Sequence, residues 1–322
     1  MYIDEFNEVI ENCRFCLMCR HLDPVGNVSF READTPRGRA LIADSIRMDP
    51  GRLENSDYIE TMYRSALSGA NRTHCVSSYD EIGLVLALRR DIVEAGFAPE
   101  NVKALAEQLS SVSFKVSGQA EFLYFGEKPE LYPDCVSITG GDPGKALEVL
   151  GFYKESRKVL SGFKKAVDKA GCKTLVVAEP SAYHFLSGRL DGVKVLHSSE
   201  YLLQNAKASG KAGEAVYLES DFLKNYCENS DSSKELLTKC GWKLLSFGPN
   251  SEESCAAGEG AVVFDELNPD VCRRLCRRVV ELAGDSEKKP FITASGYVKR
   301  VFSKYEPDIT VLTVEDVMTN PA

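Results

Sequence analysis

Three cysteines near the start of the chain constrain it most. Cys13, Cys16 and Cys19 follow the spacing C-x2-C-x2-C. Three thiolates on so short a loop can bind three corners of an iron–sulfur cube. The complete chain has 11 cysteines, an odd number that cannot all form disulfides. Its start lacks a basic stretch followed by an apolar one, so we expect a cytoplasmic protein whose cysteines bind metal or are buried.

A second run of residues suggests the fourth ligand. In bacterial two-cluster ferredoxins the run C-x2-C-x2-C-x3-C-P occurs twice, and the fourth cysteine of each run binds the cluster of the other. In this chain Asp23 stands at the fourth position of the first run, and Cys75 stands at the fourth position of a second run with the same spacing. The first three positions of that second run are Ser65, Ser68 and Asn71. All four ligands of one cluster are therefore present, and all four of its twin are replaced.

We therefore predict one [4Fe-4S] cluster bound by Cys13, Cys16, Cys19 and Cys75. The alternatives are a zinc site or buried thiols, but structural zinc usually takes two pairs of ligands and no second pair follows here. His21 or His74 could also replace Cys75 as a ligand. Arg14 and Arg20 are expected near the sulfur atoms, where positive charge and N–H donors would raise the reduction potential.

Length and charge narrow the classes of protein that remain. A chain of 322 residues is long enough for two or three folded units. Its formal net charge of -9 argues against a partner that is nucleic acid. The sequence also contains no apolar stretch as long as a transmembrane segment.

The pattern of apolar residues changes near residue 113. Up to residue 112 it is helical, with helices expected over 38–48, 58–68 and 82–96. After that, short apolar runs alternate with helical stretches such as 144–171 and 269–284, which predicts α/β layers with mainly parallel strands. The expected strands are 121–126, 173–180, 193–197, 214–220, 260–266, 289–295 and 308–314. We place the domains at 1–112, 113–210 and 211–322, with a small-residue linker near 206–215.

Together with the two cysteine runs, the segments 35–46 (TPRGRALIADSI) and 86–96 (LALRRDIVEAG) carry a family resemblance. Over about its first 100 residues the chain resembles the iron–sulfur subunits of FAD-linked oxidoreductases. Examples are the iron–sulfur subunits of glycolate oxidase, of anaerobic glycerol-3-phosphate dehydrogenase and of heterodisulfide reductase. The resemblance implies an all-helical, ferredoxin-like [4Fe-4S] domain followed by a pseudo-duplicated α/β region of the CCG type.

The resemblance also implies function and partners. The chain would be an electron-transfer subunit that relays electrons through its cluster to or from a flavoprotein subunit of the FAD-linked oxidase or electron-transfer flavoprotein type. FAD would be bound only by that partner, and a ferredoxin-like carrier would be a further partner. The alternative is a structural or regulatory subunit with a vestigial or redox-sensing cluster. A third possibility is an enzyme that binds a small ligand between its α/β halves.

The CCG signatures of the relatives are degenerate in this chain. The corresponding segments are 138–144, 178–183, 218–221, 254–260 and 294–298, and among them only Cys255 is a thiol. We therefore expect no metal in the α/β region, which would serve as a scaffold and docking surface. Its cysteines are expected to be buried apolar residues: Cys135, Cys172, Cys227, Cys240, Cys255, Cys272 and Cys276.

Two further features of the α/β region have alternatives. Cys272 and Cys276 lie four residues apart and could form a metal pair, although packing in the core is the simpler interpretation. The glycine-rich segments 139–144 and 258–261 could bind phosphate, although neither matches a known phosphate-binding motif.

Overall fold

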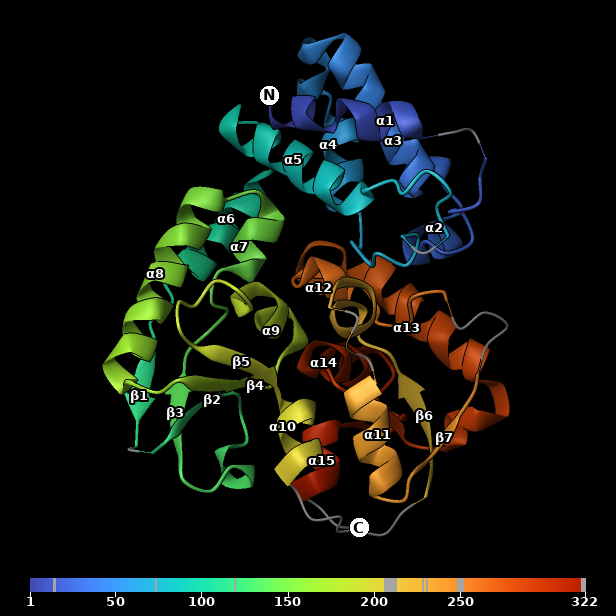
Figure 1. Cartoon of the computed structure of the whole chain (residues 1–322). Coiled ribbons are helices and arrows are strands. Elements are labelled where there is room, and N and C mark those ends of the chain that lie inside the picture. The colour runs from blue at the N-terminus through green and yellow to red at the C-terminus, as the bar shows by residue number, and fades with distance from the viewer. Residues whose placement is uncertain are drawn as a thin grey trace.

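The computed structural model describes residues 1–13, 16–72, 74–118, 120–205, 213–227, 229, 231–247 and 252–319. The chain combines helices with two sheets made mainly of parallel strands. This confirms the predicted mixture of α and α/β structure. Figure 1 shows the helical part at the top, with the first sheet below it on one side and the second sheet on the other.

Every described element in residues 1–112 is a helix. The elements are η1 (Tyr2–Phe6), α1 (Asn7–Asn12), α2 (Pro24–Ser29), η2 (Glu32–Asp34), α3 (Pro36–Met48), η3 (Pro50–Glu54), α4 (Ser56–Tyr63), α5 (Glu81–Glu94) and α6 (Glu100–Ser110). Helix α3 begins where Thr35 accepts a hydrogen bond from the N–H of Gly38, and Asp80 caps α5 through the N–H of Gly83. Helix α4 ends at Tyr63, so the predicted helix over 58–68 is wrong in its second half.

The first sheet lies within residues 113–210. Its strands are β1 (Lys115–Ser117), β2 (Phe122–Phe125), β3 (Cys135–Thr139), β4 (Thr174–Val177) and β5 (Lys194–His197). Their order is β1-β3-β2-β4-β5, and all neighbours are parallel except β1 and β3. The associated helices are α7 (Lys145–Leu150), α8 (Tyr153–Ala170), α9 (Pro180–Leu186) and α10 (Ser198–Asn205).

The second sheet lies within residues 211–322. Its strands are β6 (Glu214–Leu218), β7 (Lys243–Leu245), β8 (Phe291–Thr293) and β9 (Val311–Thr313), all parallel, in the order β7-β6-β8-β9. The associated helices are η5 (Phe222–Tyr226), α11 (Asp231–Lys239), η6 (Glu259–Ala261), α12 (Phe264–Leu267), α13 (Pro269–Ala283), η7 (Gly284–Lys288), α14 (Gly296–Tyr305) and α15 (Val314–Thr319). The order β3-β2-β4-β5 in the first sheet matches the order β7-β6-β8-β9 in the second, so the two sheets share one topology over these four strands.

One predicted strand is wrong. Residues 260–266 form η6 and the start of α12 instead. A Cβ on Gly260 would lie 2.0 Å from the carbonyl oxygen of Leu67, so this backbone packs directly on the loop after α4. Val262 adopts a left-handed conformation (φ 61°), which ends any extended run. The apolar residues of this segment are buried against the helical part rather than in a sheet.

The largest hydrophobic core crosses the predicted boundary at residue 112. It contains side chains of α3, α4 and α5 together with side chains of α7, α13 and α14. Helix α2 contacts α13, and Arg274 of α13 donates a hydrogen bond to the carbonyl of Val28 in α2 at 3.2 Å. The helical part is therefore packed on the second half of the α/β region, residues 211–322. Within the described residues, none of the helices combines the length and apolar character that crossing a membrane requires.

Candidate metal centre and the crevice between the sheets

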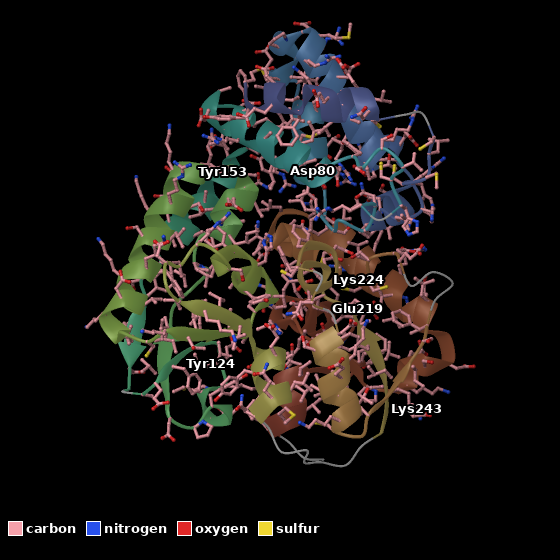
Figure 2. All side chains as sticks on the ribbon, viewed as in Figure 1. Asp80, Tyr124, Tyr153, Glu219, Lys224 and Lys243 are labelled. Atoms are coloured by element: carbon pink, nitrogen blue, oxygen red, sulfur yellow. The ribbon has the colours of Figure 1, made fainter. Side chains whose placement is uncertain are left out.

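The cysteine run leaves the end of α1. Cys13 is the residue after that helix, and its N–H donates to the carbonyl of Ile10 at 3.1 Å. Cys16 is exposed, and Cys19 lies in a turn before α2, half-buried. Cys75 belongs to the loop between α4 and α5. Figure 2 shows sulfur atoms at the edge of the helical part, beside the loop that leads from α1 to α2.

Electrostatic interactions connect these thiols. Burial, Cys75 and Cys16 together raise the pKa of Cys13. Burial is also the main cause that raises the pKa of Cys19 to about 11, and Cys13 adds to the shift. Cys75 therefore lies within electrostatic range of Cys13 in the fold, although 62 positions separate the two in sequence. The backbone N–H of Tyr79 donates to the Cys75 sulfur at 3.3 Å, a contact that stabilises a metal-bound thiolate.

Four thiolates are the donor set that a four-iron cluster requires. Cys13 interacts electrostatically with each of the other three cysteines, and the charge of Arg37 offsets only part of the rise in the Cys13 pKa. Among the described residues, no three His, Cys, Asp or Glu side chains are grouped so that they could hold a single metal ion. The cysteines of a cluster are bound to different iron atoms, so they lie farther apart than the ligands of one ion.

The neighbouring histidines and arginines have other partners or lie outside the described residues. His74 places its Nε2 atom 2.7 Å from Glu252, and His21 is exposed. Arg20 is 59% exposed and lies 3.8 Å from Glu32. Arg14, predicted beside the sulfur atoms, is not among the described residues.

A buried ion-pair network stands where the twin cluster would be. Arg39 of α3 is 1% exposed and pairs with Asp23, the residue at the lost fourth position of the first run. The Nε atom of Arg39 lies 2.6 Å from Glu81, and Glu81 accepts a hydrogen bond from Ser65 at 3.2 Å. Asp23 also accepts from the N–H of Gly26 and so caps α2. Two of the four replaced ligand positions are thus joined through Arg39 and Glu81, a network that the sequence did not predict.

The loop with the other two replaced positions packs on the second half. Ser68 and Asn71 are buried, and the side chain of Asn225 in η5 donates to the carbonyl of Ser68 at 2.7 Å. Tyr226 donates its hydroxyl hydrogen to the carbonyl of Leu67. The loop that contains Leu67 and Ser68 therefore forms an interface with η5.

Four of the five degenerate CCG segments converge between the two sheets. Glu179, which follows β4, accepts hydrogen bonds from the Ser295 hydroxyl at 3.1 Å and from the N–H of Gly296 at 2.9 Å. Glu259 accepts from the Ser220 hydroxyl at 2.9 Å and from the N–H of Asp221 at 2.6 Å. The Ser254 hydroxyl donates to Asp221 at 3.0 Å. Carboxylates and hydroxyls from both halves thus line this junction.

The geometry of the parallel sheets explains this convergence. In each sheet the connections leave in opposite directions from two adjacent strands, β2 and β4 in the first sheet and β6 and β8 in the second. The carboxyl ends of such strands form a crevice. Glu179 follows β4, whereas Asp221 and Ser295 come after β6 and β8, so the two crevices face each other.

Burial raises the pKa values of the carboxyl groups in this crevice. It is the main cause that raises the pKa of Glu179 to about 8, with the charge of Glu259 as the next cause. Burial and Asp221 raise the pKa of Glu259 to about 8, and burial raises the pKa of Asp221 to about 7. The sequence predicted no role for these acids, because their proximity depends on how the two halves face each other.

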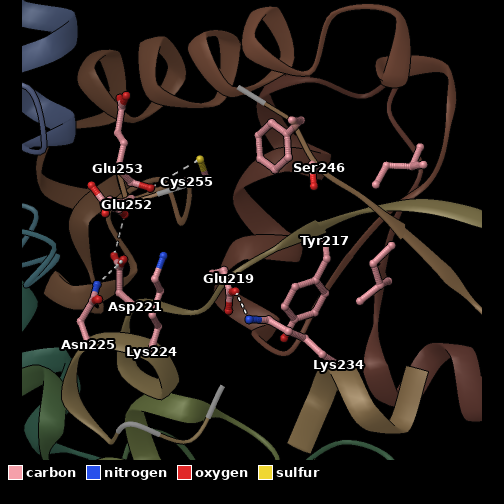
Figure 3. Close-up of a pocket in the computed structure, with 14 residues that line it drawn as sticks. Tyr217, Glu219, Asp221, Lys224, Asn225, Lys234, Ser246, Glu252, Glu253 and Cys255 are labelled. Carbon is pink, nitrogen blue, oxygen red and sulfur yellow. Dashed lines mark hydrogen bonds and ion pairs between the residues drawn. The ribbon is translucent and has the colours of Figure 1, made fainter. Parts of the chain in front are cut away.

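A cavity of about 220 Å³ opens beside this crevice. Figure 3 shows Asp221, Lys224 and Asn225 on one side of it, and Glu219 paired with Lys234 on another. Ser254 and Cys255 also line the cavity. Burial raises the pKa of the Cys255 thiol to about 12, with the charges of Glu253 and Asp221 as further causes.

The remaining cysteines divide into two groups. Cys172, Cys240, Cys272 and Cys276 are buried as predicted, and the Cys272 sulfur lies 3.4 Å from the carbonyl oxygen of Ala257. Cys135, Cys227 and Cys255 are only partly buried, so the prediction that all seven are core residues is wrong for these three. They lie at the start of a strand, after η5 and beside the cavity, where packing is incomplete.

Comparisons with family models, with curated protein sequences and with solved structures gave no match, so the family resemblance stays a prediction from the sequence.

Proposed function

We propose that the chain is an electron-transfer subunit with one [4Fe-4S] cluster, bound by Cys13, Cys16, Cys19 and Cys75. One observation carries this proposal. Cys75 is an electrostatic neighbour of Cys13, whereas an arginine-centred ion-pair network joins positions of the twin ligand set. All four thiols of one ligand set are present in this chain, whereas all four positions of the other set are replaced. The complete set is therefore the one that would bind a cluster.

The surrounding residues suit a site that gains and loses negative charge. A cluster bound here would take up and release single electrons. The N–H of Tyr79 donates to the Cys75 sulfur, and the charge of Arg37 offsets part of the rise in the Cys13 pKa. Both interactions would stabilise the more negative state of a bound cluster and so raise its reduction potential. The electron would be exchanged with a flavoprotein subunit that carries FAD.

Replacement of Cys75 tests the ligand set. Cys75→Ala should lose most of the iron and of the visible absorbance after anaerobic purification, because one corner of the cluster has no thiolate. Cys255→Ala is the matched control and should retain both, because that thiol lies in the other half beside the cavity. Loss of iron only in Cys255→Ala would contradict the proposed site.

Electron paramagnetic resonance tests the function itself. An electron-transfer subunit should give the signal of a reduced [4Fe-4S] cluster after treatment with dithionite. A cluster that is present by iron and sulfide analysis but is not reduced would support the alternative, a structural or regulatory subunit, and would contradict electron transfer.

A further inference from the structure

The cavity beside the crevice lies at the carboxyl ends of two neighbouring strands. Glu219 and Asp221 follow β6, Ser246 and Phe247 follow β7, and all four residues line the cavity. Ligands bind to parallel sheets at this edge, where the loops after the strands converge. The cavity volume of about 220 Å³ is below the roughly 300–1,000 Å³ of pockets for drug-sized molecules. Its position is therefore that of a ligand site, and its size favours a small molecule.

One side of the cavity is apolar. Leu244 and Leu245 of β7 line it together with Phe247 and with Tyr217 of β6. Leu245 pairs in register with Val216, the residue before Tyr217, so the apolar side chains come from the ends of two adjacent strands. A ligand that covers this side gains from an apolar part of its own, because apolar surface is then removed from water.

The other side of the cavity is polar and has both signs of charge. Figure 3 shows Asp221, Lys224 and Asn225 there, away from Tyr217 and Ser246. Asp221 is only 2% exposed, so its carboxyl group is held inside the protein. Lys224 belongs to η5, the helix that begins directly after Asp221. An acid and a base that are close in the chain thus line the same side.

The other carboxylates that line the cavity lie beside basic side chains. The pairs are Glu219 with Lys234 at 2.5 Å, Glu252 with His74 at 2.7 Å, and Glu253 with Arg278 at 2.8 Å. The charge that a ligand meets is then set by Asp221 and Lys224, which are of opposite sign. A ligand with a single charge would match one of these two groups and be repelled by the other.

We propose that this cavity binds an α-amino acid with a large apolar side chain, such as leucine or phenylalanine. The α-ammonium group lies against Asp221, the α-carboxylate lies against Lys224, and the apolar side chain covers Leu244 and Phe247. A zwitterion satisfies both charges at once, which neither a simple carboxylic acid nor a simple amine can do. This inference goes beyond the proposed function and does not depend on the metal centre.

Both charged groups have the capacity for these contacts. An ionised carboxyl group has about four acceptor positions. Asp221 accepts a hydrogen bond from the Ser254 hydroxyl at 3.0 Å and a longer one from the Asn225 amide at 3.5 Å, so a further donor can be added. The Lys224 ammonium group has three N–H donors, so one of them can bind a ligand carboxylate beside its other interactions.

Isothermal titration calorimetry on the full-length protein tests the ligand class. The probes are leucine, isocaproate, which lacks the ammonium group, and isoamylamine, which lacks the carboxylate. Phenylalanine is tested with its two corresponding analogues. At least one of the two amino acids should bind, and each of its analogues should bind at least about tenfold more weakly, because hydrogen bonds to charged groups are worth that much or more.

Two variants test the assigned contacts. Lys224→Met should weaken binding of the amino acid at least about tenfold but leave binding of the amine unchanged, because the amine has no carboxylate. Asp221→Asn should weaken binding of the amino acid but not that of the carboxylic acid. Circular dichroism checks that each variant is folded.

Lys243→Met is the matched control and should bind the amino acid as the unchanged protein does. Lys243 begins β7, is 72% exposed, and forms with Glu214 an ion pair that contributes little. Figure 2 shows it well away from Lys224.

Three results would overturn the inference. If neither amino acid binds to the unchanged protein, the cavity is not a site for this class of ligand. If an analogue with one charge binds as tightly as its amino acid, the ligand is a simple acid or amine instead. If Lys243→Met weakens binding as much as Lys224→Met does, Lys224 does not hold the carboxylate. None of these results bears on the iron content of the protein, so the proposed function is tested separately.

Discussion

The buried guanidinium of Arg39 offers the sharpest test of how Asp23 and Glu81 are stabilised in the core. Arg39→Met keeps most of the volume of the side chain but leaves Asp23 and Glu81 without their positive partner, at 6% and 3% exposure. Breaking a buried pair in this way costs about 3–5 kcal/mol. The free energy of unfolding of an ordinary protein is roughly 5–15 kcal/mol, so this cost is a large part of it. The loss of stability should be smaller at lower pH, where the unpaired carboxyl groups of Asp23 and Glu81 can be protonated.

Urea unfolding of the iron-free protein, followed by circular dichroism, measures this cost. Arg47→Met is the matched control on the same helix, because Arg47 pairs with Asp44 at 2.8 Å and with Glu11 at 2.9 Å but is 31% exposed. It should cost no more than about 1 kcal/mol. The triple variant Asp23→Asn/Arg39→Met/Glu81→Gln should be more stable than Arg39→Met, because no buried charge remains. Equal costs for Arg39→Met and Arg47→Met would refute the reasoning.

Two other predictions concern the α/β region. The raised pKa values of Glu259 (about 8) and Asp221 (about 7) mean that the folded state holds protons that the unfolded state releases near pH 4. Their contribution to stability is therefore present below about pH 4 and is lost as the pH rises through about 7 to 8, so chemical unfolding should require less urea at about pH 8.5 than at about pH 5.5. Glu259→Gln should flatten this dependence, and an unchanged slope would refute the assignment. Gly260→Ala should destabilise the protein by about 1–3 kcal/mol through its clash with the Leu67 carbonyl. Gly162→Ala, in α8 with its nearest neighbour 3.9 Å away, should stabilise it by about 0.5–1 kcal/mol; the same sign for both would contradict the packing.

Local patterns in the sequence predicted much of the fold. Apolar runs and helix signals located β2, β4, β5, β6, β8 and β9 and the long helices α5, α8 and α13. The segment 260–266 was predicted wrongly, because its apolar residues are as suitable for a strand as for packing on another loop. Only the contact of Gly260 with Leu67, almost 200 positions earlier, decides between the two. β1, β3 and β7 were missed. β1 and β7 contain no fully buried residue, and in β3 buried residues alternate with half-buried ones, so none of the three has a continuous apolar run.

The candidate site divides in the same way. The cysteine spacing predicts the four ligands, because the pattern lies within two short runs of sequence. The network of Arg39 with Glu81 was invisible, since 42 positions separate two residues that pair in the core. The crevice acids were missed for a similar reason: Glu179 and Ser295 acquire a common role only when two sheets of identical topology face each other.

The core that crosses residue 112 bears on how the protein can be handled and how it could have evolved. A fragment ending after α6 would expose the apolar faces of α2 and α5 that now contact α13 and α7. Such a fragment should aggregate, so the cysteine loops cannot be studied as a detachable ferredoxin. For the same reason, the helical part could not be exchanged for that of another protein without matched changes in the second half. The helical part and the second half therefore depend on one shared core for their folding.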